Sequence, residues 1–594
     1  MSRTVIQGSV PKVFDISSYR AIALKEIEID PSRLKTIKPA HKRACYRAIV
    51  NWLSSDNATG ADASNLEQSA PFIETFFHLA AAESWDKAKR IFSLQLGEME
   101  DDQFYTKLGT WGYYQQQITL AEALLDKLDK DTDSVCLNVT GTALDSLSLY
   151  EQAIAHYQKN LALNQEIGDR KGEGLTYGNL GNAQMSLNEY AKAEELFQLG
   201  LQISRETADE RIESLALGNL GNLYTAISQY QKAIEFHEAS LKIAEKLKDL
   251  KGQGRALGGL ASAYRYLHDY ETALTLNQRY LENSRQIQDR EAEGIALGNL
   301  GNVYTKLGEY AQAAEYHRQH LDIAREIHNQ WEEGNALTNL GIDDYSLGAY
   351  KSAIEHFEAA LRLAISIGDR KGESNINGNM GLVYGDLGEY DKALAYHQAN
   401  LSIAEEIGDL QGEASAVGNI SNIYFFTDRF QDCIEYAERH LALSKTIGDI
   451  RGEGTAYLNL GNAYDDLGQV DRAIEAYKKS LAIARKIGDL EGEGKALCNL
   501  GITVVQRHEY TEAVTYLRGA LAIVQETGER ATEALVLYSL AEVHQKMGQL
   551  AQACEMCDHA LEIASIIGTP LAEDCAELKE KLIGERLGNA PSPN

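Results

Sequence analysis

A glycine-rich string recurs along this sequence at a constant spacing of 40 residues, and this period constrains the fold more than any other feature. One copy reads GNLGNVYTKLGEY, from Gly298 to Tyr310. Its Leu-Gly pair recurs without slippage at Leu180-Gly181, Leu220-Gly221, Leu300-Gly301, Leu340-Gly341, Leu460-Gly461 and Leu500-Gly501. With looser copies and an extension back to Gly141, eleven units cover residues 131–570. A fixed period of this length is typical of stacked supersecondary units.

Each unit is predicted to fold as a helix, a turn and a second helix. The glycine is replaced only by small residues in the looser copies, and an alanine follows twelve residues later in nearly every unit, as at Ala193 and Ala353. Small side chains at fixed positions indicate places where two helices pack closely. An aromatic residue, Tyr310 in the copy above, lies between these two positions and precedes the second helix.

The second helices have an apolar face and a clear end. The stretch KALAYHQANLSIAEEIGD, residues 392–409, has apolar residues at helical spacing and finishes on Gly408-Asp409. Glycine is favoured just past a helix end, and aspartate can cap the helix that follows. No proline occurs between Pro71 and Pro570, which permits helix almost throughout. The sequence therefore predicts an all-α protein.

These residues resemble the tetratricopeptide repeat (TPR), which has Leu-Gly in its first helix, a tyrosine three residues later and an alanine in its second helix. The 40-residue unit, with GNLGNxY and IGDrxGEG, is similar to the long-repeat branch that includes the G-protein-signalling modulator and Partner of Inscuteable proteins. The resemblance implies a right-handed α-solenoid superhelix of helix-turn-helix units. The arginine ladder of that branch is mostly missing here, with Leu175, Ile295 and Asn335 among the equivalent sites, so its ligands are not transferred.

The ends of the chain depart from the repeat. We expect residues 1–69 to form a helical or irregular extension, with a helix from His41 and a flexible loop from Ser54 to Asn65. Residues 70–130 contain degenerate TPR-like helices, and residues 571–594 a cap helix followed by a disordered tail. The stretch from His41 to Tyr114 also resembles the helical segment that precedes the TPR sensor of bacterial STAND regulators, although no NTPase core is present.

Charge and composition narrow the classes of partner. The formal net charge of -30 opposes binding to nucleic-acid phosphates or anionic lipid and favours basic partners. Seven cysteines without a secretory segment suggest a reducing compartment, and no apolar run reaches the length of about 18 residues that spans a bilayer. We expect a cytoplasmic protein that binds no nucleic acid and does not insert into membranes.

Two kinds of binding chemistry, for phosphate and for zinc, compete with a purely structural interpretation of the glycines and cysteines. A phosphate-binding loop requires G-x-x-x-x-G-K-[ST], and Gly494-Lys495-Ala496 lacks both the first glycine and the hydroxyl. Cys554, Cys557, His559 and Cys575 could together bind zinc, but Cys554 occupies a slot that other units fill with apolar residues. We therefore predict packing rather than a metal site, no cofactor and no catalytic residues.

The TPR resemblance implies that the first helices line a concave face and that partners contact the residue after the small glycine and those three and four further on. The first of these positions gives Asn182, Asn222, Asn302, Asn422 and Asn462. The other two give Arg265, Phe425, Phe426, Asp465 and Asp466. The amides suit the backbone of an extended peptide, or alternatively bridge neighbouring repeats.

The function predicted from these patterns is a non-catalytic scaffold or adaptor. It would bind a protein or peptide segment in the concave groove, and Phe425-Phe426 beside Asp465-Asp466 favours an apolar residue followed by lysine or arginine. The alternative is the ligand-sensing arm of a signalling NTPase system. An enzyme with a cryptic metal site is a third hypothesis.

Overall fold

The computed structural model describes residues 19–54, 65–97 and 103–588. The loop predicted from Ser54 lies mostly outside these residues, and the tail from Asn589 lies wholly outside them. The chain forms two compact units. Unit 1 contains the chain up to Val383 together with Glu406–Asp409, and unit 2 contains Tyr384–Glu405 and the chain from Leu410 onwards.

The N-terminal part of unit 1 is a set of short helices. They are α1 (Tyr19–Glu26), the 3-10 helix η2 (Pro31–Thr36), α2 (Ala40–Ser54), α3 (Asn65–Ala81), α4 (Trp85–Phe92), α5 (Phe104–Thr110) and α6 (Tyr114–Leu124). Fully buried aromatic residues, among them Phe72, Phe76 and Phe104, build their common core. In the described part of the chain the only β-structure is one isolated bridge between Gln95 and Gln103.

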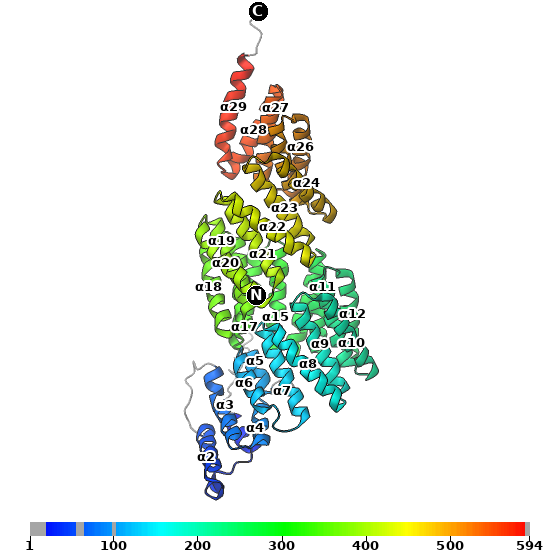
Figure 1. The fold of residues 1–594 in the computed structure, drawn as a ribbon, viewed down its shortest axis with the longest axis vertical. Coiled ribbons are helices and arrows are strands. Elements are labelled where there is room, and N and C mark those ends of the chain that lie inside the picture. The colour runs from blue at the N-terminus through cyan, green and yellow to red at the C-terminus, as the bar shows by residue number, and fades with distance from the viewer. Residues whose placement is uncertain (1–18, 55–64, 98–102, 589–594) are drawn as a thin grey trace, which may run out of the picture. The chain divides into compact units, whose positions relative to one another are not determined.

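Eleven helix pairs follow, and Figure 1 shows them in chain order by colour. The first helices of the pairs, here called A helices, are α7 (Lys130–Ser146), α9 (Arg170–Ser186), α11 (Glu210–Ala226), α13 (Leu250–Tyr266), α15 (Arg290–Lys306), α17 (Gln330–Ser346), α19 (Arg370–Asp386), α21 (Leu410–Phe426), α23 (Ile450–Asp466), α25 (Leu490–Val504, extended by the 3-10 helix η3, Val505–Arg507) and α27 (Arg530–Lys546). The second helices, the B helices, are α8 (Tyr150–Ile167), α10 (Tyr190–Glu206), α12 (Tyr230–Leu247), α14 (Tyr270–Gln286), α16 (Tyr310–Glu326), α18 (Tyr350–Ile367), α20 (Tyr390–Ile407), α22 (Phe430–Ile447), α24 (Val470–Ile487), α26 (Tyr510–Thr527) and α28 (Leu550–Ile567). A final helix, α29 (Leu571–Gly588), packs on α28. The predicted all-α array of helix pairs is confirmed.

None of the described helices is both long enough and apolar enough to cross a membrane.

The recurring Gly-Asp ends one helix and starts the next, as the sequence predicts. Gly168 takes the left-handed conformation, with φ of 75°, at the C-terminus of α8. The side chain of Asp169 then accepts a hydrogen bond of 3.0 Å from the backbone nitrogen of Gly172 and caps α9. The same pair of roles recurs at Gly488 and Asp489, so the turn is a local property of the repeat.

The small residues of the repeat allow rings to pack between helices. Gly341 of α17 faces Phe357 of α18, and a Cβ added at this glycine would lie only 2.5 Å from the ring. Gly221 of α11 faces the ring of His237 in the same way. The alanine of the second helix, Ala353 for example, is fully buried. The glycines of the recurring string are therefore packing positions and form no phosphate-binding loop.

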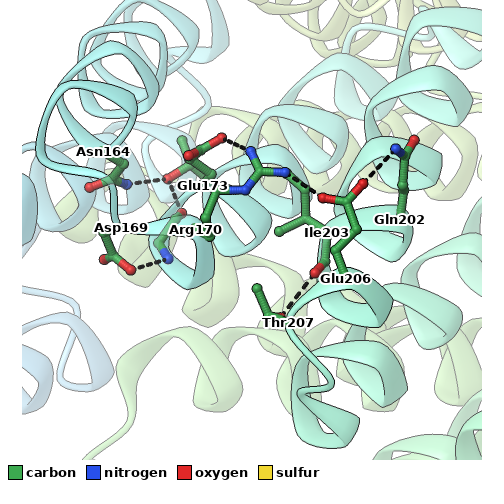
Figure 2. A network of polar contacts seen from close by, with 10 residues as sticks. Asn164, Asp169, Arg170, Glu173, Gln202, Ile203, Glu206 and Thr207 are labelled. Carbon is green, nitrogen blue, oxygen red and sulfur yellow. Dashed lines mark hydrogen bonds and ion pairs between the residues drawn. The ribbon is translucent and has the colours of Figure 1, made fainter.

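An ion-pair network accounts for the arginine that opens several of the A helices (Figure 2). Arg170 at the start of α9 contacts Glu173 on the same helix and Glu206 at the end of α10, both at 2.6 Å. Gln202 donates a further hydrogen bond to Glu206. Arg290, with Glu293 and Glu326, repeats the arrangement. These arginines tie an A helix to its own B helix, which is a structural role.

Candidate functional site

The A helices form the inner layer of each unit. In unit 1, α11 packs against α9 and α13 as well as against B helices, and in unit 2, α23 packs likewise against α21 and α25. Consecutive B helices touch one another less. Because the A helices approach each other more closely, the row of helix pairs within each unit curves toward its A helices. An exposed side chain in the middle of an A helix therefore faces solvent on this side, here called the inner face.

Four of the five predicted asparagines present unused amides near the inner face. Asn222 of α11 is exposed, and three others are half-buried: Asn182, Asn302 and Asn422. Within the described chain, none of these four side chains makes a hydrogen bond. An amide that has no partner in the chain keeps both its donors and its acceptor for a ligand.

The fifth asparagine has a structural role. The Oδ1 atom of Asn462 accepts a hydrogen bond from Tyr477 at 2.9 Å and another from the amide of Asn499 at 2.8 Å. It therefore joins α23 to α24 and to α25. In unit 1 a bridge between A helices is made by another pair, Asn179 and Asn138, whose amides lie 2.8 Å apart. Bridging and free asparagines thus coexist along the array.

Phe426, the last residue of α21, is the most exposed aromatic side chain of the predicted site, with 60% of its surface accessible. Its ring stacks on Tyr390 with centroids 6.0 Å apart and meets Phe425 edge-on at 5.8 Å. Phe425 is half-buried and packs against the core of unit 2. Of the two adjacent phenylalanines, Phe426 is therefore the one that is available to a partner.

The two predicted aspartates also differ. Asp465 accepts hydrogen bonds of 2.9 Å from both Thr503 and Gln506, so its carboxylate holds the end of α25. Asp466 is exposed, and partial burial together with the charge of Asp428 raises its pKa. A cation close to Asp466 and Asp428 would relieve their mutual repulsion.

Unit 1 contains a counterpart of the Phe426 stack. Tyr266 occupies the equivalent position in α13, is 44% exposed, and stacks on Tyr230 with centroids 5.3 Å apart. The guanidinium of Arg265 lies 4.4 Å from the centroid of the Tyr266 ring. At Phe426 the preceding residue is a phenylalanine instead, and no cation of the described residues lies over that ring. Sequence reasoning did not single out Tyr230 and Tyr390, because their role depends on stacking across two helix pairs.

Comparison with protein families decides what kind of repeat this is. Models described as tetratricopeptide repeat match residues 141–206, 213–286, 293–366, 372–446, 452–526 and 534–566, which is more than half of the chain. The chain is a tetratricopeptide repeat protein. No curated protein matches the sequence.

Several solved structures share the TPR architecture at low identity. Aspartyl phosphate phosphatase F from Bacillus subtilis is 16% identical, with 58% of this chain and 92% of that chain covered and a TM-score of 0.41. A Rap protein complexed with competence and sporulation factor is 17% identical, with 64% and 99% covered and a TM-score of 0.42. The quorum sensor NprR from B. thuringiensis, in its apo form, is 15% identical, with 58% and 99% covered and a TM-score of 0.39. At these identities the likeness concerns the fold alone.

The cysteines near the end of the TPR array lie in its core. Cys557 is fully buried, and its thiol donates to the backbone carbonyl of Cys575 at 3.2 Å. Cys554 is half-buried and packs against the same cluster. Burial raises the pKa of Cys557 to about 11, which disfavours the thiolate that a metal would need. Across the described ranges, no three His, Cys, Asp or Glu side chains are grouped so that they could hold a metal ion.

One set of side chains in the TPR core has the composition of a catalytic triad. Asp343 accepts hydrogen bonds from His317 at 2.6 Å and from Thr305 at 2.7 Å. His317 is 1% exposed and Asp343 is fully buried. The half-buried hydroxyl of Thr305 bonds to the carboxylate and not to the imidazole that would have to activate it, so we interpret this set as structural.

Proposed function

We propose that this TPR protein is a non-catalytic adaptor that binds an extended segment of a partner protein on its inner face, with Phe426 as one anchor. The observation that carries the proposal is the exposed ring of Phe426, which ends the A helix α21 and stacks on Tyr390 at the start of the B helix α20. Helix α21 packs next to α23, the helix that ends in Asp466. An aromatic side chain that is rigidly held yet exposed is the type of residue that contributes most to binding at protein interfaces.

The chemistry of the segment follows from the counterpart in unit 1. There, Arg265 places its guanidinium over the exposed ring of Tyr266. Phe426 offers an equivalent ring without such a cation, and Asp466 supplies negative charge in the same region. A partner lysine or arginine that stacks on Phe426 would reproduce this cation–π contact, and an adjacent apolar residue would pack beside the ring.

The free asparagines suit the backbone of such a segment. Asn422 lies on α21, four residues before Phe426, and offers one amide within a single turn of the anchor. In unit 1, Asn182, Asn222 and Asn302 give amides on three A helices, which would serve a stretch of backbone bound within that unit. Because a peptide bond has one donor and one acceptor, a side-chain amide can satisfy both at once.

Selection from a library of random displayed peptides against the full-length protein tests this function. We expect enrichment of sequences in which an apolar residue is followed by lysine or arginine. Binding of a selected peptide should weaken at least about tenfold in the Phe426→Ala, Asp466→Ala double variant, because hot-spot truncations typically cost 1–2 kcal/mol or more. Ile566→Ala is the matched control, since it removes an apolar side chain that is 73% exposed on the B helix α28.

Two results would overturn the proposal. One is a selection that enriches no peptide. The other is a set of selected peptides that bind the double variant and the wild type with the same affinity, which would show that the anchor lies elsewhere.

A further inference from the structure

Turns that are far apart in the sequence meet within unit 1. Leu147, in the turn between α7 and α8, lies so close to Gly368 that a Cβ added at the glycine would be 2.8 Å from Leu147 Cδ2. Leu187, one unit later, approaches Gly408 in the same way, at 3.7 Å. The two pairs have an identical separation, since 368 minus 147 and 408 minus 187 are both 221 residues. The contact is therefore a regular property of the array, repeated with its period.

A third contact extends this row by one more turn. Gly112, between α5 and α6, packs on Ile367 and Gln330, and Gln330 donates a long hydrogen bond of 3.5 Å to the hydroxyl of Tyr113. We call the combined contact the seam. It joins the turns at 112–114, 147–150 and 187–190 to residue 330 and to the turns at 367–371 and 407–409.

Equivalent positions in other units show that the seam covers side chains that are otherwise exposed. The leucines that correspond to Leu147 and Leu187 in three later units of unit 1 are 40–52% exposed: Leu267, Leu307 and Leu347. In the seam, Leu147 and Leu187 are less exposed than these leucines, since both are half-buried. Ser148, next to Leu147, is 4% exposed, whereas the equivalent Ser228 is exposed. Across the seam, Ile367 and Ile407 are buried.

The seam closes one turn of the solenoid after about five and a half units. We propose that the seam is a gate, and that a chain-like ligand reaches the inner face of unit 1 freely only when the turns at Leu147 and Leu187 part from those at Gly368 and Gly408. The proposal rests on the proposed function and deepens it, because it assigns a means of control to the inner-face asparagines of unit 1: Asn182, Asn222 and Asn302.

The seam is well suited to parting. Consecutive helices pack along their length, whereas the seam joins turn to turn through Leu147, Leu187 and the contact of Gly112 and Tyr113 with Ile367 and Gln330. Carboxylates also gather on it. Asp145 and Asp369 lie near Lys371, whose ammonium is 3.8 Å from Asp409. The neighbouring Arg370 is already paired with Glu373 and Glu406. An additional negative charge placed there would be repelled by these groups, and an apolar contact would be lost as well.

An access assay tests the gate without a partner. The reporter is Asn222→Cys on the inner face, in a background in which the half-buried Cys45 and Cys554 are replaced by serine. Its reaction rate is measured with N-ethylmaleimide and with a maleimide that carries a long polyethylene glycol chain, which enters as an extended polymer. Ile566→Cys, on an outer helix, gives the reference ratio of the two rates.

The seam is opened by Leu147→Glu with Leu187→Glu, and the control is Leu267→Glu with Leu307→Glu at equivalent exposed turns. In the protein with the intact seam, we compare the rate of the polymer reagent with that of N-ethylmaleimide at Asn222→Cys. We expect this ratio to be several-fold lower than the same ratio at the Ile566→Cys reference. The seam variant should remove this difference, while the control leaves it unchanged and the N-ethylmaleimide rate stays constant. Hydrogen exchange of residues 187–190 reports whether the seam has parted.

Three outcomes contradict the gate. Rapid reaction of the polymer with the intact seam would mean that the inner face is open already. If hydrogen exchange shows that the seam has parted and the polymer still reacts slowly, the barrier to the inner face lies elsewhere. Unchanged exchange and unchanged labelling in the seam variant would show that these leucines do not hold the turns together. The peptide selection can fail while the gate is supported, so the two proposals are tested separately.

Discussion

His317 of α16 and Asp343 of α17 form a hydrogen bond of 2.6 Å in which both side chains are removed from solvent. The four preceding units have apolar residues at the position of Asp343: Ala183, Leu223, Ala263 and Val303. Thr305 of α15 donates to the second oxygen of the same carboxylate. This unit thus carries a polar contact that joins three helices and that no neighbouring unit could make, and it distinguishes one stacking register from the others.

We expect Asp343→Ala to destabilise the stack of α15 to α17 by about 3–5 kcal/mol, because it leaves the buried imidazole of His317 without its partner, whereas Thr305 can still donate to the carbonyl of Gly301. The double variant His317→Phe, Asp343→Val introduces the side chains found at Phe357 and Val303 and should recover most of this loss. Because repeat arrays can unfold in segments, hydrogen exchange of these three helices is the appropriate measurement. If the single and the double variant lose the same protection from hydrogen exchange, the loss does not come from breaking the His317–Asp343 contact.

Two glycines of α17 should respond to alanine in opposite directions. At Gly341 a new Cβ would meet the Phe357 ring at 2.5 Å, and overpacking of this kind typically costs about 1–3 kcal/mol. At Gly334 no atom lies within 4 Å, so Gly334→Ala should stabilise the protein by about 0.5–1 kcal/mol through helix propensity. Urea denaturation of both variants makes the comparison. Stabilisation by Gly341→Ala would show that the ring moves aside at little cost.

The repeat could be predicted from the sequence because its signals are local. Period, small residues, Gly-Asp turns and the alternation of helices each lie within one unit, and the structure bears them out. The exposure of individual side chains in the candidate site could not be predicted from the sequence. Nothing in the sequence tells whether Phe425 or Phe426 is exposed, because a difference of one residue rotates a side chain by about 100° around the helix.

The seam lay beyond sequence reasoning for a different reason. Whether Leu147 meets Gly368 depends on the rotation between successive units, added over more than five of them. Leu147 and Leu307 occupy the same position of the repeat, yet Leu147 is half-buried against Gly368 and Leu307 is 40% exposed. A small change in the rotation between successive units would separate the turn at Leu147 from the turn at Gly368. For this reason no motif within one unit can predict their contact.

Acid should weaken the protein through buried histidines. His237 is 1% exposed, its two ring nitrogens lack partners in the described chain, and burial lowers its pKa to about 4. The unfolded chain takes up this proton near pH 6.5, so the stability that the neutral ring supports is present above that pH and is lost as the pH falls toward 4. At pH 5 the loss is about 2 kcal/mol.

His237→Phe tests this assignment, because Phe197 and Phe357 fill the equivalent positions of other units. The variant should lose less stability than the wild type between pH 7 and pH 5. His559→Phe, on the exposed surface of α28, is the control and should keep the wild-type pH dependence. An identical pH profile for His237→Phe and the wild type would contradict the assignment.

Asp145 should destabilise unit 1 at neutral pH. Its Oδ1 atom is buried and has no hydrogen-bond partner among the described residues, and burial raises its pKa to about 6 although Lys371 acts in the opposite direction. A carboxyl whose folded pKa exceeds the unfolded value supports stability fully below pH 3.8 and loses that support as the pH rises through 6. Asp145→Asn should therefore stabilise unit 1 by up to about 3 kcal/mol at pH 7 and have little effect at pH 4.

Asp322→Asn, on the exposed surface of α16, removes the same charge and should change stability little at either pH. Denaturation curves at pH 7 and pH 4 give the free energy of unfolding of each variant. If Asp145→Asn stabilises the protein equally at both pH values, the stabilisation comes from contacts of the new amide and not from the removal of a buried charge.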